Sequence, residues 1–277
     1  MTLPPAPEPL PSPVVDTHCH LDIVAGDEWL PVDEALEQAA AVGITRIVQI
    51  GCDVESARWS VRTAAAYDEV RAGIALHPNE APRIFAEGRH VALGDAYDAI
   101  EELAVLPEVA AIGETGLDHY RTGEDGRGIQ EESFRWHIRL ARRVGKPLVI
   151  HDRDAHDDVI RVLEDEGAPE TVVFHCFSGD ASMAAYCAER GWYLSFAGTV
   201  TFKNAEPLRE ALRVAPQDRV LVETDAPYLT PMPYRGRTNA SYLVPLTVRS
   251  MAETRGESVE SLSAALWENS VRVFGPW

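Results

Sequence analysis

Short runs of β-branched and other apolar residues alternate along this chain with longer stretches whose apolar residues recur every three or four positions. The short runs predict β-strands and the longer stretches predict amphipathic helices. The predicted strands cover residues 14–16, 44–50, 70–76, 109–112, 147–150, 171–174, 192–195 and 219–222. The predicted helices cover residues 33–41, 54–66, 95–106, 130–144, 155–166, 182–190, 207–214, 242–255 and 258–274.

This alternation predicts an α/β protein with a parallel sheet, which is either open or closed into a barrel. Runs such as 44–50, with Ile44, Ile47, Val48 and Ile50, and 171–174, with Val172, Val173 and Phe174, are rich in apolar residues, as parallel strands buried on both faces are. No glycine-rich dinucleotide loop follows the first strand, which counts against an open doubly wound sheet. Eight strand–helix units favour a single-domain (β/α)8 TIM barrel over residues 14–277.

Composition and charge bear on the N-terminal segment, the cellular location and the mode of substrate binding. Residues 1–13 are proline-rich and lack apolar periodicity, so we expect a flexible N-terminal arm. Neither a signal peptide nor an apolar run long enough to cross a membrane is present, and the four cysteines form no CxxC pair, so we expect a cytoplasmic protein with reduced thiols. The net charge of −19 excludes a protein that coats nucleic acid by bulk electrostatics, so an anionic substrate must be held locally.

Side chains that bind metals gather where the predicted strands end. His18 and His20 are two positions apart in an extended segment, so both imidazoles point to the same side. The carboxyl ends of barrel strands share one rim, where barrel enzymes place their active sites. The six candidate ligands at this rim are His18, His20, Glu114, His151, His175 and Asp225. Each residue alone has an ordinary structural explanation, such as a helix cap or a hydrogen-bonded histidine, but the joint pattern favours a metal site.

Six ligands exceed what one tetrahedral catalytic metal needs, because such a site keeps three protein ligands and a water. We therefore expect two divalent ions, with Glu114 as the bridge, His18, His20 and Asp225 on one ion, and His151 and His175 on the other. Mixed imidazole and carboxylate ligands suit Zn, Mn, Ni or Fe and accept Mg, so the sequence does not select the ion among Mg, Mn and Zn.

Six segments that contain the candidate ligands or lie near them follow one another along the chain: DTHCHLD at 16–22, LHP at 76–78, GETGLD at 113–118, HDR at 151–153, HCFSG at 175–179 and ETDAPYL at 223–229. Taken in this order, they resemble the TatD-type deoxyribonucleases of the metal-dependent amidohydrolase superfamily. The resemblance implies a (β/α)8 barrel, cleavage of DNA phosphodiesters from a 3′ end, and the same six ligands. It also implies that Glu114 bridges the ions in place of the carbamylated lysine of related barrels. His137 departs from the pattern, since many relatives carry glutamine there.

The catalytic and substrate-binding roles of these residues are stated as hypotheses. We predict that water activated by two ions attacks phosphorus, that Asp225 accepts its proton, and that Glu114 and His77 complete the catalytic group, with His77 on the scissile phosphate or the leaving oxygen. The predicted phosphate contacts on rim loops are Arg153, Ser178, Arg235, Arg237 and Asn239. The expected partner is DNA, in the form of single-stranded ends, and the sequence indicates no protein partner.

Two other functions stay open at this point. The same two-metal rim could hydrolyse an amide, a lactone or an aminoacyl ester, including a D-amino acid linked to tRNA, and the net charge of −19 slightly favours this alternative. The second alternative is a metal-binding scaffold without turnover, which the intact ligand set counts against.

Overall fold

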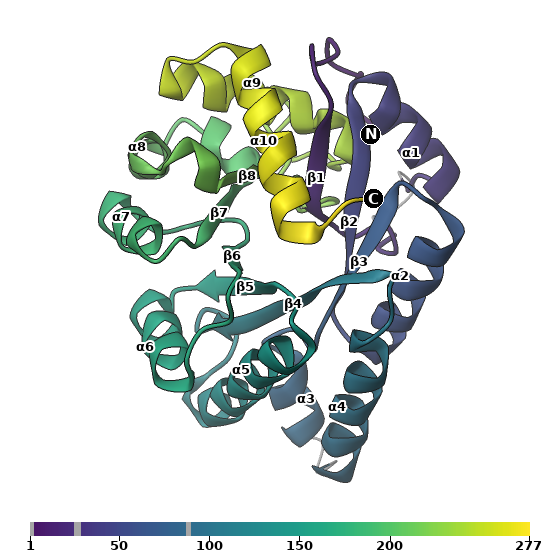
Figure 1. Ribbon diagram of the computed structural model, residues 1–277, viewed down its shortest axis with the longest axis vertical. Helices are drawn as coiled ribbons and strands as arrows, with labels where there is room; N and C mark the ends of the chain where they lie inside the picture. Colours follow the sequence, from purple (N-terminus) through teal and green to yellow (C-terminus); the bar gives the residue numbers. More distant parts are fainter. Residues whose placement is uncertain (1–2, 25–28, 87–89) are drawn as a thin grey trace. The chain divides into compact units, whose positions relative to one another are not determined.

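A computed structural model of the chain describes residues 3–24, 29–86 and 90–277. Its parallel strands are β1 (Val14–Cys19), β2 (Ile44–Gly51), β3 (Val70–Ile74), β4 (Val109–Asp118), β5 (Leu148–Arg153), β6 (Val172–Phe174), β7 (Tyr193–Phe196) and β8 (Val220–Val222). Its α-helices are α1 (Val32–Ala41), α2 (Val54–Ala66), α3 (Glu80–Ala86), α4 (His90–Ala104), α5 (Glu124–Val144), α6 (His156–Glu166), α7 (Ala181–Glu189), α8 (Glu206–Val214), α9 (Val244–Arg255) and α10 (Val259–Phe274). The alternation of strands and helices in Figure 1 is the element order of a (β/α)8 barrel.

Each predicted strand and helix has a counterpart in the structure, although several bounds differ. Strand β1 ends at Cys19 rather than residue 16, β3 at Ile74 rather than 76 and β5 at Arg153 rather than 150, and α4 begins at His90 rather than 95. Strand β4 continues through the GETGLD segment to Asp118 instead of ending at residue 112. Helix α5 begins at Glu124 rather than at residue 130, because Gly126 and Gly128 lower helix propensity and obscure its start. Helix α3 was not predicted, since its seven residues are too few for a clear period.

The chain forms two compact units, Met1–Gln49 with Cys176–Trp277 and Ile50–His175. In the first unit, β1 pairs in parallel with β2, and β7 pairs in parallel with β8. A parallel bridge joins Cys19, at the end of β1, to Ala226, beyond the end of β8. The residues that follow β1 and β8 are therefore neighbours, although about 200 positions separate them in the sequence.

The last helix of the chain covers the first strand in this unit. Helix α10 lies beside β1 in Figure 1 and packs on β1 and β8, with Leu262, Leu266 and Val273 buried. The Ser258 side chain accepts a hydrogen bond from the Ser261 N–H and so caps the start of α10. The apolar stripe of α10 therefore explains how β1 is kept from water.

The predicted N-terminal arm makes specific contacts with the first unit. The Tyr242 hydroxyl donates to the Pro4 carbonyl at 2.6 Å, and Arg249 donates to the Glu8 carbonyl at 2.8 Å. The Leu10 N–H donates to the Val42 carbonyl at 3.0 Å. Hydrogen bonds thus join residues 4–10 to the rest of the first unit, where the Leu10 side chain is also buried. The expected flexibility of the arm stays a prediction.

In the second unit, β3, β4, β5 and β6 form a parallel sheet in sequence order. Gly116 of β4 lies opposite His151 of β5 and has a φ of 140°. A Cβ atom at Gly116 would lie 2.1 Å from the His151 carbonyl oxygen, so no residue with a side chain fits there. The glycine of the GETGLD segment therefore lets β4 run close to β5, which places Glu114 near His151.

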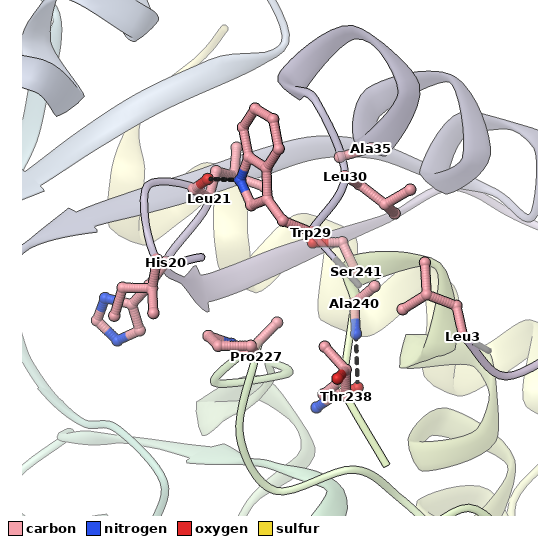
Figure 2. A pocket seen from close by; sticks show the side chains of 13 residues that line it. Leu3, His20, Leu21, Trp29, Leu30, Ala35, Pro227, Thr238, Ala240 and Ser241 are labelled. Carbon is pink, nitrogen blue, oxygen red and sulfur yellow. Dashed lines mark hydrogen bonds between the residues drawn. The ribbon is translucent and has the colours of Figure 1, made fainter. Parts of the chain in front are cut away.

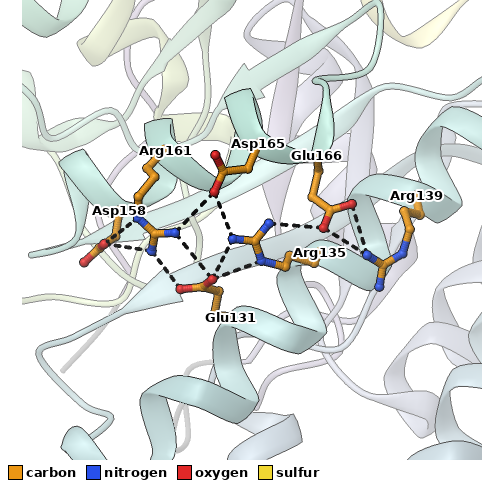
Figure 3. Close-up of polar contacts among 7 residues, drawn as sticks. All are labelled: Glu131, Arg135, Arg139, Asp158, Arg161, Asp165 and Glu166. Carbon is orange, nitrogen blue, oxygen red and sulfur yellow. Dashed lines mark hydrogen bonds and ion pairs between the residues drawn. The ribbon is translucent and has the colours of Figure 1, made fainter.

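An ion-pair network joins α5 to α6 in the same unit (Figure 3). Arg135 contacts Glu131 at 2.7 Å, Glu166 at 3.1 Å and Asp165 at 3.2 Å. Two further arginines extend the network. Arg161 contacts Asp158 at 2.9 Å, and Arg139 contacts Glu166 at 3.0 Å. The two helices are therefore held together on their outer side by charge as well as by packing.

Among the described residues, no helix is long and apolar enough to cross a membrane. All four cysteines are free thiols.

Candidate metal centre

Three of the predicted ligands come together in the first unit. Nε2 of His20 lies 3.4 Å from Oδ1 of Asp225, and Nε2 of His18 lies 3.8 Å from the same oxygen. His18 belongs to β1, His20 follows it, and Asp225 lies in the turn after β8. The two imidazoles and the carboxylate thus converge on one point, as the spacing of His18 and His20 predicts.

Hydrogen bonds between the ends of β1 and β8 hold these ligands in place. Asp16, fully buried, accepts from the Thr224 N–H at 2.9 Å and from the Thr224 hydroxyl at 2.6 Å. The Asp225 N–H donates to the His18 carbonyl at 2.9 Å. Asp225 has a φ of 55°, a left-handed conformation that aspartate tolerates better than most residues. The turn therefore sends the Asp225 carboxylate toward the histidines of β1.

Two buried carboxyl groups surround this set, and sequence reasoning missed both. Burial raises the pKa of Glu223 to about 7, although the charge on His18 opposes the rise. Glu223 accepts a hydrogen bond from the Cys176 N–H at 2.7 Å. Burial also raises the pKa of Asp16 to about 6, against hydrogen bonds from Thr224 that lower it. Asp16 lies two positions before His18 and Glu223 two positions before Asp225. This spacing is the signal in the sequence that could have indicated them.

The other three predicted ligands, Glu114, His151 and His175, lie together in the second unit. Glu114 is 4% exposed, and its Oε2 lies 3.1 Å from Nε2 of His175. Its Oε1 lies 2.9 Å from Nε2 of His77 and 3.6 Å from Nδ1 of His151. The ligand atoms of His77, Glu114 and His151 all lie within 4.8 Å of one another, close enough to share one ion. His77, predicted as a substrate contact, is thus also placed among metal-type ligands.

Polar contacts orient the imidazole rings of His77 and His151. Nδ1 of His77 accepts from the Asn79 N–H at 3.1 Å, so the proton of a neutral His77 resides on Nε2, the nitrogen beside Glu114. Nε2 of His151 lies 3.4 Å from Oδ2 of Asp118, which leaves Nδ1 directed at Glu114. Burial acts to lower the pKa of His151, but hydrogen bonds and charge from Asp118 and Glu114 outweigh it and raise this pKa to about 9. A cation bound at Glu114 would compete with the proton on the His151 imidazole.

Sequence reasoning missed a buried polar network that supports Asp118. Asn79 donates to Asp118 Oδ2 at 3.3 Å and accepts from the Thr122 hydroxyl at 2.7 Å. Gln130, fully buried, accepts from the Asp118 N–H at 2.9 Å and donates to the Pro78 carbonyl at 3.1 Å. The network therefore ties the loop that carries His77 to the end of β4. Its one signal in the sequence is that Asp118 closes the GETGLD segment.

His137 supports the same loop from α5. It is 0% exposed, and its Nε2 accepts from the Leu76 N–H at 3.1 Å, one residue before His77. Its Nδ1 lies 2.8 Å from the Ser133 carbonyl, so this nitrogen carries the proton. Burial lowers the pKa of His137 to about 4, although the bond to Ser133 opposes the fall. The histidine that departs from the family pattern is therefore a neutral, buried structural residue.

The predicted phosphate contacts lie in varied surroundings. The guanidinium of Arg153 lies 4.0 Å from the centre of the Tyr120 ring, and Arg235 lies 4.3 Å from that of Phe202. Ser178 is exposed, and Arg237 stacks over Tyr234 at 5.6 Å. Asn239 is buried, and its amide donates to the Thr224 and Tyr228 carbonyls at 2.9 and 2.6 Å. The Asn239 side chain is thus engaged in shaping the loop after β8.

A mostly apolar pocket lies beside His20 in the first unit (Figure 2). Trp29, Leu21 and Pro227 form part of its wall, and the Trp29 indole N–H donates to the Leu21 carbonyl at 3.3 Å. Its volume of about 50 Å³ is far below the ~300–1,000 Å³ of pockets that hold small-molecule ligands. This pocket therefore has no room for a nucleotide.

The residues of both units fit divalent metal ions. Imidazole nitrogens and carboxylate oxygens are the ligands that Zn and Mn prefer, and each unit brings both kinds within 4 Å of one another. Two further properties agree with a metal site. Nε2 of His151 faces Asp118, which leaves Nδ1 on the side of Glu114, and Glu114 is buried among three histidines.

The whole chain resembles known proteins of one class. The family model described as "TatD related DNase" matches residues 15–275. The crystal structure of YJJV, a TatD homologue from Escherichia coli K12, superposes with a TM-score of 0.85 at 26% identity, covering 95% of this chain and 98% of that one. The class is therefore a (β/α)8 barrel with an amidohydrolase-like fold, as the sequence predicts.

The similarity to individual proteins is close. An uncharacterized metal-dependent hydrolase TatD of Mycobacterium tuberculosis is 46% identical over 267 residues, 95% of this chain and 98% of the relative. A protein of Citrobacter rodentium named 3′-5′ ssDNA/RNA exonuclease TatD is 34% identical over 251 residues, 88% of this chain and 91% of the relative. This chain belongs to the TatD family of metal-dependent hydrolases.

Proposed function

We propose that this protein is a metal-dependent deoxyribonuclease that removes nucleotides from the 3′ end of single-stranded DNA in the cytoplasm. The observation that carries the proposal is the contact of one buried carboxylate, Glu114, with His77, His151 and His175. The description of the matching family and the name of the Citrobacter relative support a nucleic-acid substrate.

Each unit carries its own part of the proposed ligand set. His18, His20 and Asp225 of the first unit would hold one ion, and Glu114, His151 and His175 of the second unit would hold another. Two such ions would polarise the phosphate and lower the pKa of the attacking water.

The protein's own residues would supply proton transfer and orientation. Asp225 has a side chain that is 15% exposed, so water can reach its carboxylate, and it is the proposed acceptor of the proton from the attacking water. His77 carries its proton on Nε2, because Asn79 occupies Nδ1, so it is the proposed hydrogen-bond donor to the phosphate or the leaving oxygen. Arg153, Ser178, Arg235 and Arg237 remain the proposed phosphate contacts.

Cleavage of single-stranded DNA tests this function. Oligonucleotides labelled at either end are incubated with Mg²⁺ or Mn²⁺ and resolved on a gel. We expect stepwise shortening from the 3′ end. Because the ions contribute several kcal/mol, the Glu114→Gln variant should lose activity at least about 100-fold. The exposed Glu102→Gln on α4 removes one carboxylate elsewhere and should keep the wild-type rate.

A second candidate is hydrolysis of an amide, a lactone or an aminoacyl ester at the same centre. The net charge of −19 favours it, because bulk repulsion weakens the binding of a polyanion. If the protein binds metal but cleaves no oligonucleotide, while it releases the amino acid from an aminoacyl ester, the nuclease proposal is wrong and this one replaces it.

A further inference from the structure

The second unit contains a groove large enough for a ligand of nucleotide size. It lies between α3 and the loop that leads into α5, and its volume of about 530 Å³ falls within the ~300–1,000 Å³ range of ligand pockets. Its lining includes Asn79, Pro82, Arg83, Phe85, Arg121 and Thr122. It is about ten times larger than the pocket beside His20.

The inner wall of the groove reaches the residues of the candidate metal centre. Asn79 lines the groove and donates to Asp118 at 3.3 Å, and Asp118 in turn lies 3.4 Å from His151. Arg121 follows three positions after Asp118, and its N–H donates to the Asp118 carboxylate at 2.8 Å. A chain bound in the groove would therefore begin beside the metal-type ligands of this unit.

The side chains of the groove and of its adjoining loop match a single nucleic-acid strand. Phe85 and Tyr120, 39% and 65% exposed, are the exposed large aromatic residues among the described part of this unit. Arg121 is exposed, and Arg153 lies over the Tyr120 ring. Exposed aromatics stack bases without regard to sequence, and arginines between them neutralise phosphates. Because the protein is acidic overall, such a cluster of cations can direct a polyanion to one place.

Not every charge in the groove favours a phosphate. Arg83 is paired with Glu80 at 2.6 Å, and Asp125 contributes a carboxylate to the lining. The contacts with phosphate are therefore assigned to Arg121 and Arg153, and Phe85 is assigned to a base.

We propose that this groove binds the single strand next to the scissile phosphate, with bases on Phe85 and Tyr120 and phosphates on Arg121 and Arg153. The inference rests on the proposed nuclease function and adds the path of the substrate beyond the metal centre. In this proposal, contacts in the groove account for the binding of single-stranded DNA to a protein with a net charge of −19.

Equilibrium binding separates the groove from the chemistry. A fluorescein-labelled 12-nucleotide oligo-dT is titrated with the full-length protein in EDTA, where no cleavage occurs, and fluorescence anisotropy is followed at several salt concentrations. Phe85→Ala should weaken binding about tenfold, since stacking of one base is worth ~1–3 kcal/mol, whereas Phe85→Tyr keeps the ring and the affinity. Arg121→Ala should lower the slope of log K against log salt by about 0.7, the value for one phosphate on a single strand.

The matched control removes the same charge outside the groove. Arg143, on α5, is exposed and pairs with Glu101 at 2.8 Å, so Arg143→Ala should leave the salt slope unchanged. If Arg121→Ala and Arg143→Ala give equal salt slopes and Phe85→Ala binds the oligonucleotide with unaltered affinity, the proposal that the strand binds in the groove is wrong. Wild-type protein that cleaves DNA with Mn²⁺ but binds no oligonucleotide in EDTA would also overturn the groove and leave the nuclease standing. Wild-type protein that neither binds nor cleaves it would overturn both.

Discussion

Oδ2 of Asp118 lies 3.4 Å from Nε2 of His151, on the side of the imidazole ring away from Glu114. A carboxylate behind a metal-binding histidine fixes the orientation of the ring and the nitrogen that stays free for the ion. Asn79, Arg121 and Gln130 hold Asp118 in turn through hydrogen bonds. Asp118 and its hydrogen-bond partners therefore fix the orientation of His151 in the candidate metal centre of this unit.

Removal of Asp118 should weaken metal binding without removing a ligand. We expect Asp118→Ala to lower the affinity for Mn²⁺ or Zn²⁺ by about 10- to 100-fold, and Asp118→Asn, which keeps an oxygen acceptor, to lose less. Isothermal titration calorimetry on the metal-free protein measures both. The exposed Asp98→Ala on α4 controls for the loss of one negative charge. If Asp118→Ala binds metal as well as that control does, Asp118 does not orient His151.

The proposed division of ligands between two ions predicts the stoichiometry of single variants. Wild-type protein should bind two equivalents of metal, whereas Asp225→Ala and His175→Ala should each retain about one, because each removes a ligand of a different ion. Elemental analysis after gel filtration counts the ions. The exposed Asp218→Ala should keep both. Loss of both ions in either variant would show that the two sites are not separable in this way.

His137 should make the protein less stable in mild acid. Its pKa is about 4 in the folded state and near 6.5 when unfolded, so between these values only the unfolded chain takes up the proton. Stability contributed by neutral His137 is therefore complete above pH 6.5 and falls as the pH drops toward 4. From pH 6.5 to pH 5 the loss should be about 2 kcal/mol in the free energy of unfolding.

Urea unfolding in EDTA at pH 7 and at pH 5 measures this loss. His137→Gln offers an acceptor for the Leu76 N–H but does not titrate, so its stability should fall less over the same range. An identical fall for wild type and His137→Gln would assign the acid sensitivity to other groups.

The ion-pair network of Figure 3 should contribute modestly to stability. Arg135 contacts three carboxylates, whereas Arg143 contacts Glu101, so Arg135→Ala should cost about 1 kcal/mol and Arg143→Ala less than half of that. Screening in 1 M NaCl should reduce the difference between the two variants. Urea unfolding at low and high salt provides the measurement. A cost for Arg135→Ala that is unaffected by salt would point to lost packing of its methylene groups instead.

Much of the fold could be predicted because each strand and helix carries its own local period. The alternation of elements and the end of β8 follow from patterns within a few residues, whereas β1 and β4 continue beyond their predicted ends, to Cys19 and Asp118. The start of α5 and the short helix α3 could not be located, since glycines and brevity weaken the same patterns. The six candidate ligands could be named because metal-binding side chains at strand ends are unusual in a local context.

The sequence by itself determined the order of elements, the family and the residues able to bind metal, because these depend on local periodicity and residue chemistry. Only the tertiary structure decided which nitrogen of His77 and of His151 faces Glu114, since that choice is made by Asn79 and Asp118 across the loop. It also decided that His137 is buried and neutral, and that Phe85 and Arg121 line one groove. Such relations join residues that lie tens of positions apart, and they arise when packing brings hydrogen-bond partners together and excludes water from them.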